Sequence, residues 1–232
     1  MIMLNLLLFI FLNISYNSNE LINSSWISEF NGVSEVRIYT DKFFSIAQYD
    51  ISNNKFIGTS GGIYSIDNGY YEVIEFNSLD SSFVGDTIYY NNIKINVKND
   101  IGMMELDEKT FTKNPDEKKL TGSWLMSGIE RRGEMRMRDV NRPRKTMKLL
   151  AGNRFQWIAY DTSKKGFYGS GGGTYTAKNG NYIENIEFFS RDSNTVGKSL
   201  EFNFEIKEGN WHHKGFSSKG DPKYEIWTQR KQ

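Results

Sequence analysis

Histidine is the side chain in this sequence best suited to acid–base or metal chemistry, and the chain has only two, His212 and His213. Neighbouring side chains of a strand point to opposite faces, so the pair cannot chelate one metal ion. The chain also lacks cysteine, which excludes disulfides, thiolate metal ligands and a cysteine nucleophile. We therefore expect no metal site and no cofactor. If the protein is a pocket enzyme, such as a hydrolase or an isomerase, His212 or His213 would act as its base.

Two glycine-rich segments, 55–65 (KFIGTSGGIYS) and 166–176 (GFYGSGGGTYT), resemble phosphate-binding loops at first sight. The second lacks the helix start and the lysine and hydroxyl pair that a nucleotide site needs. Its glycines, including Gly172 and Gly173, alternate with strand-forming residues. We therefore expect a structural role for them, at a bulge or bend of a strand that packs under a ring such as Trp157.

The segment 130–145 (ERRGEMRMRDVNRPRK) is rich in arginine, whose planar fork suits carboxylate or phosphate binding. Strand alternation places both methionines of MRMR on one face and Arg136 and Arg138 on the other, where the arginines could equally face solvent. Phe155 and Trp157 share one face of their strand and could fill a core or line a pocket. The candidate ligand-binding residues are Arg136, Arg138, Phe155, Trp157, His212 and Lys219.

The chain contains an internal duplication, in which residues 44–50 (FSIAQYD) align with 155–161 (FQWIAYD). Beyond this segment the glycines keep one register, and Tyr71 aligns with Tyr182. Each copy contains six to nine short strand patterns separated by turn signals, and no segment sustains a helical period. We therefore expect an all-β protein made of two tandem antiparallel meander barrels.

Several aspartates recur in both copies. Asp50 aligns with Asp161, and Asp80 aligns with Asp192. All four lie next to turn-forming residues, so we expect them to cap turns rather than to act in catalysis.

The segment boundaries follow from the repeat. We expect a signal peptide at 1–23, a degenerate repeat at 24–110, a linker at 111–119 and a second domain at 120–232. The apolar run 1–12 is too short to span a bilayer comfortably and is typical of a secretory signal peptide, with an uncleaved anchor as the alternative. We expect a secreted or periplasmic protein with no stable membrane span after signal removal.

The two copies differ in charge. Residues 24–110 carry 6 basic and 13 acidic side chains, net −7, whereas residues 120–232 carry 20 and 12, net +8. The two halves could dock through complementary surfaces, or the second could present a cationic mouth to an anionic ligand. The whole chain has a net charge of only +1, so we expect no nucleic-acid partner.

The segment 120–124 (LTGSW), followed by a meander and by the basic residue of IWTQR (226–230), resembles the lipocalin pattern. Residues 120–230 are similar to a lipocalin-like, calycin-type family of secreted bacterial proteins of unknown function, in the segments RPRKTMKLL, FQWIAYD, GGGTYT, ENIEFFSRD and GDPKYEIW. The resemblance implies a closed barrel in which Trp124 plugs one end and Arg230 packs across it. In the first copy Ser24 replaces the glycine of this motif, and the expected last strand has no arginine.

These patterns favour a non-catalytic protein that binds a small amphipathic or anionic ligand in the second barrel. Binding needs only apolar walls and a few well-placed cations. A pocket enzyme that uses one of the histidines is the first alternative. An accessory or interaction module with filled barrels is the second.

Overall fold

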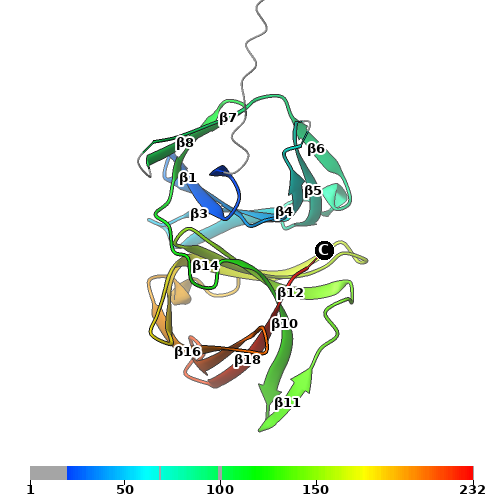
Figure 1. Ribbon diagram of the computed structural model, residues 1–232, viewed down its shortest axis with the longest axis vertical. Helices are drawn as coiled ribbons and strands as arrows, with labels where there is room; N and C mark the ends of the chain where they lie inside the picture. Colours follow the sequence, from blue (N-terminus) through cyan, green and yellow to red (C-terminus); the bar gives the residue numbers. More distant parts are fainter. Residues whose placement is uncertain (1–19, 68, 99–100, 232) are drawn as a thin grey trace, which may run out of the picture.

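The computed structural model describes residues 20–67, 69–98 and 101–231. Over these residues the chain folds into two antiparallel sheets of nine strands each, with the short 3₁₀ helices η2 (Ser81–Phe83) and η3 (Ser193–Thr195). None of the described helices has the length and apolar character needed to cross a membrane. Residues 1–19, which hold most of the expected signal peptide, lie outside the described residues. The all-β prediction is confirmed, and the two sheets stack on each other (Figure 1).

The first sheet curls into a half-barrel. Its strand order is β6-β5-β4-β3-β2-β1-β9-β8-β7, and the described sheet does not close, because Asn91 and Asn92 separate β6 from β7. The last strand, β9, takes in the first three residues of the expected linker 111–119. The strands are β1 (Ser24–Phe30), β2 (Val33–Tyr39), β3 (Phe43–Asp50), β4 (Lys55–Ser65), β5 (Tyr70–Asn77), β6 (Thr87–Tyr90), β7 (Ile93–Lys98), β8 (Ile101–Leu106) and β9 (Lys109–Lys113).

The second sheet, all of whose residues are described, closes into a barrel of eight strands. The pairing of β10 with β18 completes the ring β10-β12-β13-β14-β15-β16-β17-β18, while β11 extends from β10 as a hairpin. The predicted closed meander is thus confirmed in this unit. The strands are β10 (Gly122–Arg131), β11 (Glu134–Met137), β12 (Arg144–Ala151), β13 (Arg154–Asp161), β14 (Gly166–Lys178), β15 (Asn181–Phe189), β16 (Ser199–Lys207), β17 (Asn210–Phe216) and β18 (Pro222–Gln229).

The two units share one strand register, which confirms the duplication. Trp26 pairs with Arg37 in the first unit as Trp124 pairs with Lys148 in the second. The shared aspartates take their predicted turn roles. Two of them accept a backbone hydrogen bond at the start of η2 and η3, and the other two do so in the turns after β3 and β13.

One detail of the sequence alignment is wrong. Ladder positions make Tyr70, not Tyr71, the counterpart of Tyr182. The extra residue of the second copy lies in the hairpin between β14 and β15, where a turn accepts it without shifting a strand. Glu72 and Glu184 therefore occupy equivalent positions, a correspondence that the sequence alignment did not show.

The glycine-rich strand β14 bends against its neighbours, as predicted. A Cβ on Gly172 would lie 2.5 Å from a carbonyl oxygen of β13, and one on Gly173 would lie 2.0 Å from the carbonyl oxygen of Asn185. A Cβ on Gly171 would lie 2.7 Å from the Trp157 ring. Only glycine fits this bulged strand, so the sequence pattern reflects the fold rather than a phosphate site.

The two units pack face to face and do not share a sheet. Strands β2, β3 and β4 lie against β12, β13 and β15. One buried hydrophobic cluster spans both sheets, so the units form a common core. Its members are Val36, Ile38, Phe43, Ala47, Tyr49 and Phe76 of the first unit and Leu125, Met147, Leu149, Ala151, Ile158, Tyr160 and Phe188 of the second.

An ion pair crosses this largely apolar interface. Arg230 Nη2 lies 2.6 Å from Glu75 Oε1, and Nη1 lies 2.8 Å from Oε2. The guanidinium also lies 3.9 Å over the Phe43 ring. The backbone of Arg230 donates to Ser123 just after β18 ends, and its side chain points out of the barrel to the first unit. The cation–π partner of Arg230 is therefore Phe43, and the packing across Trp124 that the resemblance implies is replaced by a contact between units.

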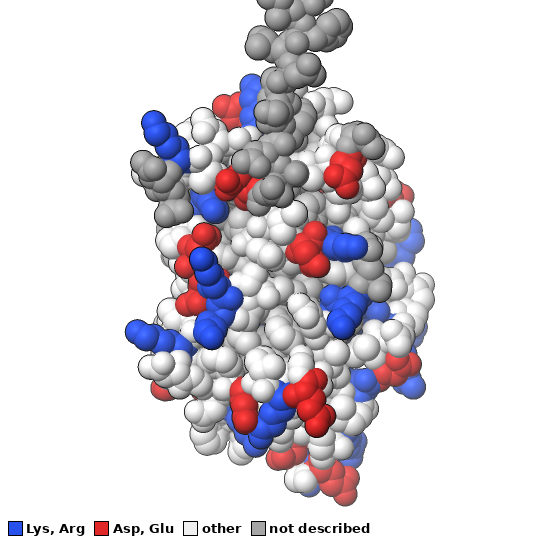
Figure 2. All heavy atoms as spheres, viewed as in Figure 1, with Lys and Arg blue, Asp and Glu red and all other residues white. Residues whose placement is uncertain are grey.

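On the visible face of the molecule (Figure 2), the charge difference between the halves does not form two uniform surfaces. On the face shown in Figure 2, acidic and basic side chains are interspersed over the molecule. Docking between the halves therefore rests mainly on the apolar core, with the Glu75–Arg230 pair as a charged contact within it.

Candidate functional site

The two ends of the second barrel differ in their connections. At one end, two-residue turns at 152–153, 179–180 and 208–209 join the strands. At the other end lie the longer connections 190–198 and 217–221 and the arginine-rich segment between β10 and β12. The long loops therefore gather at one end of the barrel, and loops of this kind often carry binding residues.

A cavity of about 740 Å³ occupies the barrel interior below these loops. Its volume lies within the range of roughly 300–1,000 Å³ that is usual for small-molecule sites. The strands supply apolar walls, and the loops supply most of the rim. The apolar wall residues include Met126, Ile129, Trp157, Ile186, Phe189, Leu200, Phe202 and Trp227.

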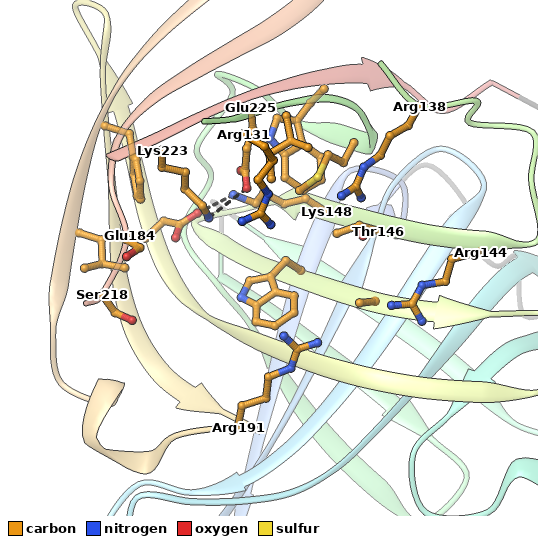
Figure 3. Close-up of a pocket in the computed structure, with 18 of the residues that line it drawn as sticks. Arg131, Arg138, Arg144, Thr146, Lys148, Glu184, Arg191, Ser218, Lys223 and Glu225 are labelled. Atoms are coloured by element: carbon orange, nitrogen blue, oxygen red, sulfur yellow. Dashed lines mark hydrogen bonds and ion pairs between the residues drawn. The ribbon is translucent and has the colours of Figure 1, made fainter. Parts of the chain in front are cut away.

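Charged side chains also line the cavity, and among the described residues seven are basic and three acidic, an excess of four positive charges. Figure 3 shows how the labelled members of this set surround the cavity. The basic residues are Arg131, Arg138, Arg142, Arg144, Lys148, Arg191 and Lys223, and the acidic ones are Asp139, Glu184 and Glu225.

Two ion pairs line the inner part of the cavity, and both of their carboxylates are buried. Lys148 is buried as well, whereas the side chain of Lys223 is 35% exposed. Lys148 Nζ lies 2.6 Å from Glu184 Oε1, and Lys223 Nζ lies 3.1 Å from Glu225 Oε1. Burial alone would raise the pKa of Glu184, but the charge of Lys148 holds it below its usual value. Because each cation is matched by a carboxylate, this floor is polar but nearly neutral.

The two histidines lie on opposite sides of β17, as strand alternation predicts. His213 is fully buried, with Nδ1 3.3 Å from Glu225 Oε2. Burial and the nearby Lys148 lower the pKa of His213 to about 4, although Glu225 opposes the shift. The ring is therefore neutral at pH 7. His212 is on the outer face, with Nδ1 2.8 Å from the Tyr224 hydroxyl.

The rim differs from the floor because four of its arginines form no ion pair with any described carboxylate: Arg131, Arg138, Arg144 and Arg191. Arg144 lies 3.4 Å over the Tyr168 ring, and Arg191 Nε donates to the Tyr168 carbonyl oxygen at 2.9 Å. Burial and the charges of Arg131 and Arg144 hold the pKa of Arg138 below its usual value. The rim is a set of like charges that an anion would stabilise.

An aromatic core fills the closed end of the barrel beneath the floor. Trp124 is buried there, donates its indole N–H to the Leu120 carbonyl oxygen at 2.9 Å and meets Trp211 edge-on at 5.8 Å. Trp124 is thus part of the packed aromatic core at this end of the barrel. Lys148 Nζ lies about 5 Å above the Trp211 and Trp227 rings, so the floor rests directly on this core.

Two of the six candidate ligand-binding residues line the cavity and four do not, among them His212 on the outer face of β17. Arg138 and Trp157 line the cavity. Phe155 lies deeper, in the aromatic core, while Arg136 and Lys219 are exposed and do not contribute to the wall. The candidate residues did not include Arg131, Arg144 and Arg191, which also line the cavity. Each lies at or next to the loop end of a strand, and that position could have indicated them.

The first unit repeats the floor but not the cavity. Arg37 is the counterpart of Lys148 and lies 2.9 Å from Glu72, the counterpart of Glu184. Here a second carboxylate, Glu35, lies 3.0 Å from Arg37 and 2.6 Å from Lys109. The hollow beside this network measures only about 180 Å³. The large cavity is therefore a feature of the second copy.

Compared with models of known protein families, the chain matches none, and no curated protein matches it significantly in sequence. The closed antiparallel barrel of eight strands agrees with the lipocalin-like resemblance at the level of architecture.

Proposed function

We propose that the protein is a lipocalin-like binding protein whose second barrel holds a small amphipathic anion without converting it. The observation that carries the proposal is the set of unpaired arginines at the rim of an apolar-walled cavity. An anionic group at the rim would meet cations that have no carboxylate partner, while the organic part would contact the walls.

The wall chemistry supports useful affinity. Each methylene group that leaves water contributes about 0.8 kcal/mol. A chain of about ten methylenes would therefore contribute about 8 kcal/mol, which is of the same order as the free energy lost on association. The contacts of the anionic group with the arginines would supply the remaining affinity.

The state of the floor supports binding rather than turnover. Glu184 is held ionised by Lys148 and so is a poor proton donor at pH 7. His213, the histidine that faces the interior, is fully buried and contacts Glu225. These groups are occupied with one another, which favours a structural role for them.

Isothermal titration calorimetry with dodecanoate and dodecyltrimethylammonium, both below their micelle concentrations, tests the proposal. Dodecanoate should bind one molecule per chain, and the cation of equal chain length should bind at least tenfold more weakly. Trp157→Ala should weaken dodecanoate binding, whereas Phe30→Ala, at an exposed ring of the first unit, should not. Equal binding of the two probes contradicts the proposal, as does the absence of binding by dodecanoate and by every other twelve-carbon anion tested.

A further inference from the structure

The rim and the floor of the cavity differ in how their charge is compensated. At the floor, Lys148 and Lys223 each lie within 3.1 Å of a carboxylate. At the rim, Arg142 is 3.6 Å from Asp139, but the four other arginines have no such partner among the described residues. The excess of positive charge in the cavity is thus concentrated at its mouth. A single carboxylate there would leave most of it uncompensated.

Three of these arginines come from the part of the chain that the first copy lacks or shortens. Arg131 ends β10, Arg138 follows β11 and Arg144 begins β12. Figure 3 shows their side chains directed into the cavity from one side, with Arg191 opposite them. The insertion therefore adds four arginines to the mouth, counting Arg142, but only one lining carboxylate, that of Asp139.

Tyr168 holds two of the rim arginines in place. Its ring supports the guanidinium of Arg144 at 3.4 Å, and its carbonyl oxygen accepts from Arg191. Side chains fixed in this way lose less conformational entropy when a ligand binds. Planar guanidinium groups, which donate in pairs, suit an oxyanion with several oxygens.

The floor disfavours a strong anion. Glu184 and Glu225 already compensate the charges of Lys148 and Lys223 there, so a multiply charged anion would meet no excess of positive charge. The multiply charged group of a ligand therefore belongs at the rim, and its apolar part belongs against Trp157, Phe189 and Phe202.

We propose that the ligand is a phosphate monoester with an apolar body, whose dianionic phosphate lies among Arg131, Arg138, Arg144 and Arg191. This inference rests on the proposed function, since it specifies the charged group of the same ligand. The proposed ligand differs from a fatty acid in its charged group. It differs from free phosphate in having an apolar body that would contact the walls.

Dodecyl phosphate and dodecyl sulfate test the charge, because both groups are tetrahedral and carry the same chain. At pH 8 the phosphate carries nearly two negative charges and the sulfate carries one, since the second pKa of a phosphate monoester is about 6. Calorimetry at pH 8 should show dodecyl phosphate binding at least about tenfold more tightly, equivalent to about 1.4 kcal/mol. At pH 5 this advantage should shrink to less than about threefold. Dodecyl sulfate measured at both pH values reports any change in the protein itself.

The double variant Arg131→Gln/Arg138→Gln should remove the preference for phosphate. The control Arg132→Gln/Arg136→Gln, which removes the same two charges from the same hairpin outside the cavity wall, should preserve it. Inorganic phosphate should bind at least a hundredfold more weakly than dodecyl phosphate. Thermal unfolding of each variant shows that it is folded.

Equal binding of the two probes at pH 8 would overturn this inference while leaving the proposed function intact. So would a preference that survives the double variant, or inorganic phosphate binding as tightly as the ester. Failure of dodecanoate and of both twelve-carbon esters to bind would overturn the proposed function as well.

Discussion

Replacing Glu75 with glutamine tests the ion pair that joins the two units. The Glu75 side chain is 15% exposed and that of Arg230 is 10% exposed. Glutamine keeps the shape and can still accept a hydrogen bond from Tyr160, but it removes the charge. Arg230 then remains at the interface, over Phe43, without a matching anion.

The expected loss follows from this burial. Removing one partner of a buried ion pair destabilises a protein by about 3–5 kcal/mol. Because both side chains keep some contact with water, we expect the lower end, about 3 kcal/mol, for Glu75→Gln. Arg230→Met should lose a similar amount, since it leaves Glu75 unpaired. The double variant should lose less than either single variant, because it leaves no uncompensated charge at the interface.

Urea unfolding at pH 7, followed by circular dichroism, measures these free energies. The common core predicts a single transition for both units. Lys94 and Glu105 provide a matched control, because they form an ion pair at 3.2 Å with more than half of each side chain exposed. Glu105→Gln should change the free energy of unfolding by no more than about 0.5 kcal/mol. A loss in Glu75→Gln as small as in this control, or additive losses in the double variant, would refute the reasoning.

The contribution of the Glu75–Arg230 pair to stability depends on pH. Burial would raise the pKa of Glu75, but the hydrogen bonds and charge of Arg230 lower it below the ordinary value of 4.5. A lowered folded-state pKa stabilises the protein above the unfolded-state pKa, and this contribution disappears as the pH falls. The difference in stability between the natural protein and Glu75→Gln should therefore be complete above pH 4.5 and shrink below it.

Three further predictions concern the second barrel. A histidine signal in nuclear magnetic resonance spectra should titrate at about pH 4 and be absent in His213→Gln. The unfolded chain protonates His213 near pH 6.5. As the pH falls from 6.5 to 4, the free energy of unfolding of the natural protein should therefore decrease by up to about 3 kcal/mol relative to that of this variant. Gly173→Ala should lower the free energy of unfolding by about 3 kcal/mol or prevent folding, because its Cβ would lie 2.0 Å from a carbonyl oxygen. Gly197 lies in open space at φ +85°, so Gly197→Ala should lower the free energy of unfolding by only about 1 kcal/mol. Lys148→Met should destabilise the protein by about 3 kcal/mol by leaving Glu184 unpaired, and Lys148→Met/Glu184→Gln should recover part of the loss in chemical denaturation.

The sequence was sufficient to predict the strands and the duplication. These features depend on local patterns, such as alternation along β13 and β15 and the turns at 179–180 and 208–209. The glycine bulge was also predictable, because glycines that alternate with strand formers at the same place in both copies indicate a backbone requirement.

Contacts that depend on the packing of one unit against the other could not be predicted. Arg230 looked like an internal cation because the family pattern places it near Trp124, and only the stacking of the sheets brings it to Glu75. The rim posed a different problem. Arg191 lies far along the chain from Arg131 and Arg138, and only closure of the barrel brings these side chains to one mouth.

The two copies show how the duplicated fold came to have one large cavity. Both place a cation of the second strand against a glutamate of the fifth, Arg37 with Glu72 and Lys148 with Glu184, so this pair belongs to the fold itself. In the first unit Glu35 joins the pair and the strand corresponding to β16 is broken into β6 and β7, which leaves a small hollow and an open sheet. In the second unit β16 is continuous and the barrel is closed. Among the described residues, no counterpart of Glu35 joins the Lys148–Glu184 pair. Substitutions at the shared pair should therefore affect folding, and ligand selectivity should respond to the arginines of the insertion.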